Sequence, residues 1–230
     1  MWSQCERGQG TQGERTGWDA PWPCAEMLKT LAELNEQCLE LLAEQALQRA
    51  TPAAPMLREL KELWRRLDAS GRRRAAACPY LLVDAGFADP SRWGWMGAQR
   101  MEDREPDTFA PFFTVPGVTG VAHQVFNNAW YMIRIEPVGA PLFLGMPTHC
   151  AALFKTCTMR QIAELADRHA AWLRPRWPGR TKVWSELLLA AISDDGIALE
   201  RARMRGVQLL ATELKTLQQV HASDSRCGAA

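Results

Sequence analysis

The sequence predicts an all-α protein: a helical bundle in which an N-terminal helical hairpin precedes a C-terminal multi-helix domain. Apolar residues recur every three or four positions over most of the 230 residues, which is the period of amphipathic helices. Prolines and glycines gather between these stretches. No alternation of strand and helix patterns indicates a parallel sheet. With 47% hydrophobic and 23% charged residues, the chain can bury a sizeable core.

The N-terminal third predicts a disordered tail followed by a helical hairpin. Residues 1–23 mix glycine, glutamine and charge without apolar periodicity, so they cannot bury enough surface to become ordered. Residues 24–78 form the hairpin, because leucines recur at helical spacing from Cys24 onward. The run TPAAP at 51–55 removes backbone donors and ends the first helix. The same period restarts in the second helix at Leu57, Leu60, Leu63, Trp64 and Leu67.

Residues 79–118 predict a short helix and an irregular connection. Pro79 suits the first turn of a helix, and Gly86 suits the left-handed residue at its end. A strand over the same residues is the alternative, but it needs parallel neighbours that the sequence does not show. Asp84 is then a surface or capping residue rather than a catalytic one. The remaining residues, rich in glycine, proline and tryptophan, form the connection.

Residues 119–219 predict the second helical domain. Thr119 caps its first helix, which Pro137 and Gly139 close. A short helix follows from Leu142 to Phe154. The next helix begins with a capping box, in which Thr158 is followed three residues later by Gln161.

The end of this domain contains a basic turn and two more helices. The turn WLRPRWPGR at 172–180 precedes a helix that contains Trp184. Ser193 and Asp194 open the last long helix, in which Gly206 indicates close helix packing because glycine costs roughly 1 kcal/mol against alanine there. Residues 220–230 are expected to form a disordered tail.

The overall charge and the cysteines restrict what the protein binds and where it acts. A formal net charge of +1 gives no long-range field that would attract DNA or an anionic membrane, so nucleic-acid contact needs a local basic cluster. The seven cysteines are odd in number and irregularly spaced, which favours reduced thiols in a cytoplasmic protein. No apolar stretch reaches the roughly 20 residues of a membrane-spanning helix, so we expect no membrane partner.

No catalytic motif is recognisable, and we expect no enzyme activity, no cofactor and no small-molecule substrate. The sequence lacks GxGxxG, the Walker lysine loop, HExxH and GxSxG, and no residue context selects a cysteine nucleophile. Zinc could be proposed for His149, Cys150, Cys157 and His169. Their spacing matches no common tetrahedral site, so core thiols and exposed imidazoles are the simpler interpretation and no metal is expected.

Two basic clusters stand out from the neutral average. The first comprises Arg65, Arg66, Arg72, Arg73 and Arg74, and we interpret it as a solvated helix end whose cations complement the helix dipole. The second lies in the basic turn, where guanidinium groups can bind phosphate while tryptophans anchor the turn. Its candidate DNA-binding residues are Arg168, Arg174, Arg176, Arg180 and Lys182.

The ten tryptophans also suggest protein interfaces, because this side chain often anchors them, although core packing accounts for most. The candidate partner-binding residues are Trp130, Trp177, Leu199 and Leu210. One functional hypothesis is therefore a helical adaptor or secretion accessory protein that binds other proteins without binding DNA.

The stretch LGMPTHCAALFKTCTMRQIAELADRH at 144–169 resembles the D subunit of the bacterial flagellar master transcriptional regulator (the FlhD family). The features that carry the resemblance are Leu144, Gly145, Met146, Ala151, Thr158, Met159, Gln161, Leu165 and Ala166. The Arg-x-Arg-aromatic run that follows is matched by Arg174, Arg176 and Trp177, and the last helix by Leu199, Gly206 and Val207. The resemblance extends over residues 121–217.

This resemblance implies an all-helical cytoplasmic regulator of flagellum biogenesis, a homodimer that works with a second subunit to activate transcription on DNA. The companion subunit would provide much of the DNA contact. Three departures bear on this expectation. Leu173 stands where the family often has a cysteine that links two subunits, Pro175 replaces an apolar residue, and the first 120 residues have no counterpart in the family's short chain.

Overall fold

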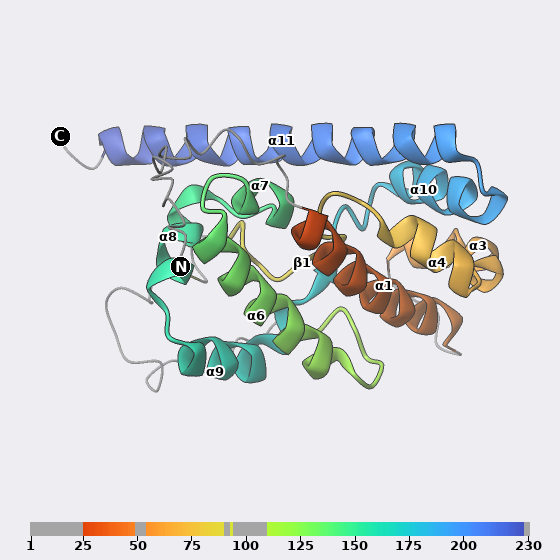
Figure 1. Cartoon of the computed structure of the whole chain (residues 1–230), viewed down its shortest axis with the longest axis horizontal. Helices are drawn as coiled ribbons and strands as arrows, with labels where there is room; N and C mark the ends of the chain where they lie inside the picture. Colours follow the sequence, from red (N-terminus) through yellow and green to blue (C-terminus); the bar gives the residue numbers. More distant parts are fainter. Residues whose placement is uncertain (1–24, 49–53, 90–92, 94–109, 228–230) are drawn as a thin grey trace, which may run out of the picture.

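The computed structural model describes residues 25–48, 54–89, 93 and 110–227. Ten α-helices occur in these ranges, together with one 3-10 helix and one pair of two-residue strands, so the all-α prediction is confirmed. The tail predicted over residues 1–23 lies outside the described residues. The last helix continues to Cys227, so the C-terminal tail predicted from residue 220 is helical over most of its length (Figure 1).

The N-terminal hairpin has more helices than predicted. Its elements are α1 (Ala25–Leu47), α2 (Pro55–Arg58), α3 (Lys61–Arg66) and α4 (Ala69–Ala76). The predicted second helix is broken at Glu59 and Leu60, where the Leu60 backbone leaves helical geometry. Arg72, Arg73 and Arg74 lie in the separate helix α4, which Asp68 caps because its carboxylate accepts a hydrogen bond from the Gly71 N–H at 2.6 Å.

The short helix predicted at residues 79–86 is wrong. Val83–Asp84 form the strand β1, and the flanking residues are irregular. The reason is a buried side chain of α1: Asn35 Nδ2 donates to the Tyr80 carbonyl at 2.9 Å, and its Oδ1 accepts from the Leu82 N–H at 2.8 Å. These bonds satisfy backbone groups that a helix would have paired locally. Gly86 does adopt a positive φ of 79°, but after a strand.

The second half of the chain contains α6 (Val118–Ile135), α7 (Ala140–Leu144), α8 (Thr148–Thr156), α9 (Met159–His169), a 3-10 turn (Ala170–Trp172) and β2 (Arg174–Pro175). Thr119 lies inside α6, because Gly117 with φ 88° precedes the helix. The predicted helix from Leu142 to Phe154 is split at Gly145, whose φ is 61°. The capping box at Thr158 and Gln161 is confirmed.

The two last helices, α10 (Thr181–Ser193) and α11 (Gly196–Cys227), complete the fold. Ser193 and Asp194 end α10 instead of opening α11, since Asp194 is its left-handed last residue with φ 55°. The Asp195 carboxylate accepts from the Ala198 N–H at 3.0 Å at the start of α11. Figure 1 shows α11 running along the whole length of the molecule, beside α10 at one end and α7 further along.

The core is continuous across the two halves. Helix α1 packs against α6, and α10 packs against α3 and α4. Trp64 and Trp184 meet in the core with ring centroids 5.8 Å apart, and Trp93 lies 5.0 Å from Phe154. Most tryptophans of the described residues are therefore buried in the core, where their large rings contribute to packing.

Close packing occurs at Gly206 as predicted, but its neighbour is the irregular segment before β1 and not another helix. This residue of α11 lies against the Tyr80 ring, and a Cβ atom at that position would overlap the Tyr80 hydroxyl. Tyr80 is itself buried and packs edge-on against Trp177 with centroids 5.8 Å apart. The glycine therefore sets the distance between α11 and the segment before β1.

Candidate functional site

Arg176 lies in the core, contrary to the prediction that it contacts DNA. Only 7% of this residue is exposed. Its Nε donates to the Leu81 carbonyl at 2.7 Å, and its Nη2 donates to the Leu144 carbonyl. Its backbone N–H donates to the Leu82 carbonyl at 2.9 Å. The residue therefore links β2, the segment before β1 and the end of α7.

The surroundings of Arg176 explain how the protein buries a guanidinium group. Desolvation lowers the pKa of Arg176, and the nearby carboxylates of Asp84 and Glu213 oppose this effect. Gly145 leaves the space for the group, because a Cβ there would overlap the guanidinium. An arginine beside a tryptophan has the same sequence pattern at a surface and in a core, so the burial of Arg176 cannot be predicted from its neighbours in sequence.

Arg174 and Asp84 face each other across the strand pair. β1 and β2 are antiparallel, with Val83 opposite Pro175 and Asp84 opposite Arg174. Arg174 Nε lies 4.0 Å from Asp84 Oδ2, and 41% of the arginine side chain is exposed. Asp84 also accepts a hydrogen bond from the Phe87 N–H at 3.1 Å, so it caps a turn. Pro175 sits in β2 and leaves the pairing intact.

The other predicted cations lie at the surface. Arg168 is in the last turn of α9, and Arg180 and Lys182 are at the start of α10. Within the described part of the chain, Arg180 and Lys182 have no carboxylate partner. Together with Arg205 of α11 they line a shallow groove of about 460 Å³.

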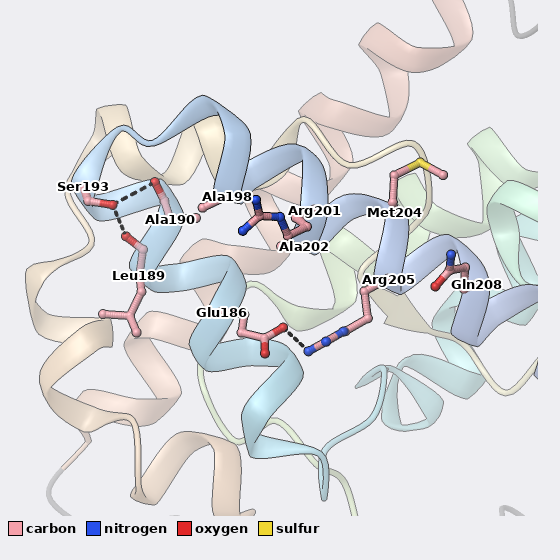
Figure 2. A pocket seen from close by; sticks show the side chains of 10 residues that line it. All are labelled: Glu186, Leu189, Ala190, Ser193, Ala198, Arg201, Ala202, Met204, Arg205 and Gln208. Carbon is pink, nitrogen blue, oxygen red and sulfur yellow. Dashed lines mark hydrogen bonds and ion pairs between the residues drawn. The ribbon is translucent and has the colours of Figure 1, made fainter.

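A second hollow continues this groove along α10 and α11. It has a volume of about 550 Å³, and Figure 2 shows its side chains coming from both helices. Leu189 and Met204 line it and are about half exposed, at 49% and 54%. Arg205 pairs with Glu186 across it, and Arg205 and Gln208 line both hollows. We call the two hollows together the α10–α11 groove.

The predicted partner-binding residues are largely internal. Leu199 and Leu210 are buried, and the Trp177 indole donates to Glu213 Oε1 at 2.7 Å, which fastens β2 to α11. Trp130 is half-buried: its indole donates to the Cys157 carbonyl at 2.8 Å, and the Arg134 guanidinium lies 4.8 Å from its ring. These four residues do not form one exposed patch.

The described cysteines are buried thiols that form no disulfide. No group of three or more histidine, cysteine, aspartate or glutamate residues within the described ranges could hold a metal ion. Burial raises the pKa of the Cys38 thiol to about 12 and that of Cys157 to about 11. Such thiols stay protonated near neutral pH and are poor nucleophiles.

Neither a protein-family model, a curated protein nor a solved structure matches the chain. Among the described residues, no helix is both long and apolar enough to cross a membrane. The α10–α11 groove, which combines an apolar part with a basic part, is the candidate site.

Proposed function

We propose that the chain is a helical subunit of a transcription regulator that acts with a second protein subunit on DNA. The resemblance to the flagellar regulator D subunit motivates this proposal. In it, the α10–α11 groove receives the partner, and the exposed cations at its basic end and at β2 contact DNA phosphates inside the complex. Direct reading of bases is not part of the proposal.

The local structure of the resembling stretch supports this function. Gly145, Thr158 and Gln161 each occupy a position that requires their chemistry, at a left-handed turn and a capping box. Leu165 and Ala166 are buried on α9. The quoted motif therefore corresponds to the consecutive short helices α7, α8 and α9.

The convergence of three cations on one groove is the observation that carries the proposal. Arg180, Lys182 and Arg205 come from two helices or their first turns yet line the same hollow, and only Arg205 among them pairs with a described carboxylate, that of Glu186. Guanidinium and ammonium groups around a concave surface suit phosphate oxygens. A net charge of +1 suits a subunit that binds DNA weakly alone, because the local cluster has no long-range field to support it.

The apolar end of the groove favours a second candidate function, a protein adaptor without DNA binding. Exposed apolar side chains beside a hollow are typical of helix-in-groove recognition. Of the five predicted DNA contacts, Arg176 is buried and Arg174 faces Asp84. The adaptor hypothesis therefore competes with the proposal on the same groove, and the next two experiments separate them.

Charge reversal at the basic end should weaken DNA binding by the assembled complex. The variant combines Arg174→Glu, Arg180→Glu and Lys182→Glu. We expect it to bind DNA at least about tenfold more weakly. We also expect the slope of log affinity against log salt concentration to fall by about two to three, one for each lost phosphate contact. The complex is purified from the native host, and its binding to sheared host chromosomal DNA is measured across salt concentrations. The matched control reverses Arg66, Arg73 and Arg160, which are exposed on other helices. Equal loss in both triple variants would contradict the proposed site.

Polar substitution at the apolar end should release the partner. Leu189→Glu with Met204→Glu should lower the yield of the co-purified subunit about tenfold or more, because charged groups would have to be desolvated in the contact. The control carries Ile135→Glu and Val138→Glu, two exposed apolar residues outside the groove. Retained partner in the Leu189 and Met204 variant means that the subunit binds elsewhere. Retained partner without any DNA binding in the wild type supports the adaptor hypothesis.

A further inference from the structure

Among the described residues, the order of elements in the first half of the chain is repeated in the second, apart from the 3-10 helix Ala170–Trp172 before β2. The series α1, α2, α3, α4, β1 corresponds to α6, α7, α8, α9, β2. In each series a long helix is followed by a short helix with proline in its first two positions, another short helix, a capped helix and a two-residue strand. The side-chain caps, Asp68 of α4 and Thr158 of α9, occupy the same place in both series.

A spacing of 90 or 91 residues relates the long helices, the helix caps and the strands of the two series, whereas the short helices α2 and α7 begin 85 positions apart. Asp68 and Thr158 are 90 positions apart, and the strands β1 and β2 begin 91 positions apart. The same 91-residue spacing carries six buried positions of α1 onto six buried positions of α6. These are Leu31, Leu34, Asn35, Cys38, Leu41 and Leu42 in α1, and Ala122, Val125, Phe126, Ala129, Met132 and Ile133 in α6.

The backbone at the strand ends follows the same relation. Gly86 and Trp177, 91 positions apart, both have positive φ values, 79° and 51°. This conformation is unusual for tryptophan, so its occurrence at the matching place is informative. The antiparallel pairing of Val83 with Pro175 becomes, under the same spacing, the pairing of Arg174 with Asp84. A two-fold axis between the strands would produce this pattern.

In each half, one tryptophan packs against the core of the other half. Trp93 follows β1 but packs against Phe154 of α8, and its indole donates to the Gly86 carbonyl at 2.7 Å. Trp184, 91 positions later, follows β2 but packs against Trp64 of α3, and its indole donates to the Arg176 carbonyl at 2.9 Å. Trp64 and Phe154 each precede their helix cap by four residues.

We propose that residues 25–93 and 118–184 are two copies of one module, fused in one polypeptide as a swapped pseudo-dimer. The surface through which a single module would pair with a second copy is occupied within the chain by β1, β2, α1 and α6. Two modules of one chain therefore pair with each other in the way that two chains of a homodimer would pair. A homodimer is what the family resemblance implies. This inference does not depend on the proposed function.

A designed disulfide across the strand pair tests this inference in the full chain. Pro175 lacks an N–H and the neighbouring Arg176 N–H bonds to Leu82, so Val83 and Pro175 form a pair without backbone hydrogen bonds. Facing residues of such a pair have Cα atoms about 4.5 Å apart, within disulfide range. In Val83→Cys with Pro175→Cys, peptide mapping after oxidation should find residues 83 and 175 linked inside a single chain. The single variants and the oxidised wild type are the controls.

Two results of this experiment would overturn the inference. In one, the link occurs only in covalent dimers, which means that the strands pair between two chains. In the other, no link forms although the double variant keeps the circular dichroism of the wild type.

Hydrogen exchange on two conservative variants supplies an independent readout if the double cysteine variant fails to fold. Trp184→Phe should accelerate exchange about tenfold in α3 and α4 of the opposite half, and Trp93→Phe should do so in α8 and α9. Increases confined to α10 for the first variant and to residues 85–89 for the second would contradict the exchange of tryptophans between halves.

Discussion

Replacing Arg176 with methionine is expected to cost about 3–5 kcal/mol of folding free energy, the largest effect of any single substitution considered. The guanidinium donates to the carbonyls of Leu81 and Leu144, which are separated in sequence but adjacent in the core. Methionine fills much of the volume but leaves both acceptors unpaired, and each unpaired buried acceptor costs about 1–3 kcal/mol. Urea unfolding followed by tryptophan fluorescence measures the change.

The matched control for this variant is Arg174→Met. That side chain is 41% exposed and its nearest carboxylate is 4.0 Å away, so a loss below about 1 kcal/mol is expected. Arg176→Lys should fall between the two, because an ammonium keeps the charge but cannot reproduce the guanidinium geometry. If Arg176→Met were as stable as Arg174→Met, the structural role given to Arg176 would be wrong.

Replacing Gly206 with alanine is expected to destabilise the protein by about 3 kcal/mol, the upper end of the usual cost of overpacking. Alanine is the better helix former by roughly 1 kcal/mol, so propensity alone predicts the opposite sign. The clash of the new methyl group with the buried Tyr80 ring outweighs this gain, since Tyr80 is held by Trp177 and cannot move freely. Thermal and urea unfolding both report the change.

Gly120→Ala is the control for this prediction. Gly120 is also helical, in α6, but nothing lies within 4 Å of its added Cβ atom. Its substitution should be neutral or stabilising by up to about 1 kcal/mol. In a Tyr80→Leu background, Gly206→Ala should lose most of its cost. A Gly206→Ala variant as stable as Gly120→Ala would show that α11 does not approach Tyr80 this closely.

Features that depend on local sequence could be predicted. The period of apolar residues located α1, α6, α10 and α11, because burial of one face repeats with the helical period. The capping box at Thr158 was predictable from two residues three positions apart. Gly206 was also readable, because a mid-helix glycine is costly unless a neighbour needs the space.

Features that depend on distant partners could not be predicted. The strand β1 depends on hydrogen bonds from two distant partners. Asn35 lies 47 residues before Leu82, and β2 begins 91 residues after β1. Leu81 and Leu144 similarly determine the burial of Arg176. The repeated series of elements leaves almost no trace in residue identity, since Leu31 matches Ala122 and Asp68 matches Thr158. The spacing, the burial pattern and the matching tryptophans Trp93 and Trp184 reveal it.

The α10–α11 groove was partly anticipated. Arg180 and Lys182 were predicted as anion contacts, whereas Arg205, Leu189 and Met204 were not. A surface formed by two antiparallel helices depends on where the turn between them lies. The prediction started the last helix at Ser193, whereas α10 ends at that residue.

The most direct test of the proposed function is native purification of the tagged full chain, followed by identification of the protein and DNA that remain bound. We expect one second protein subunit and a small set of enriched chromosomal fragments, both present in the wild type. The fragments should be lost in the Arg174, Arg180 and Lys182 triple variant while the subunit is retained. A chain that purifies alone, or with a subunit but no enriched DNA, would contradict the proposed function.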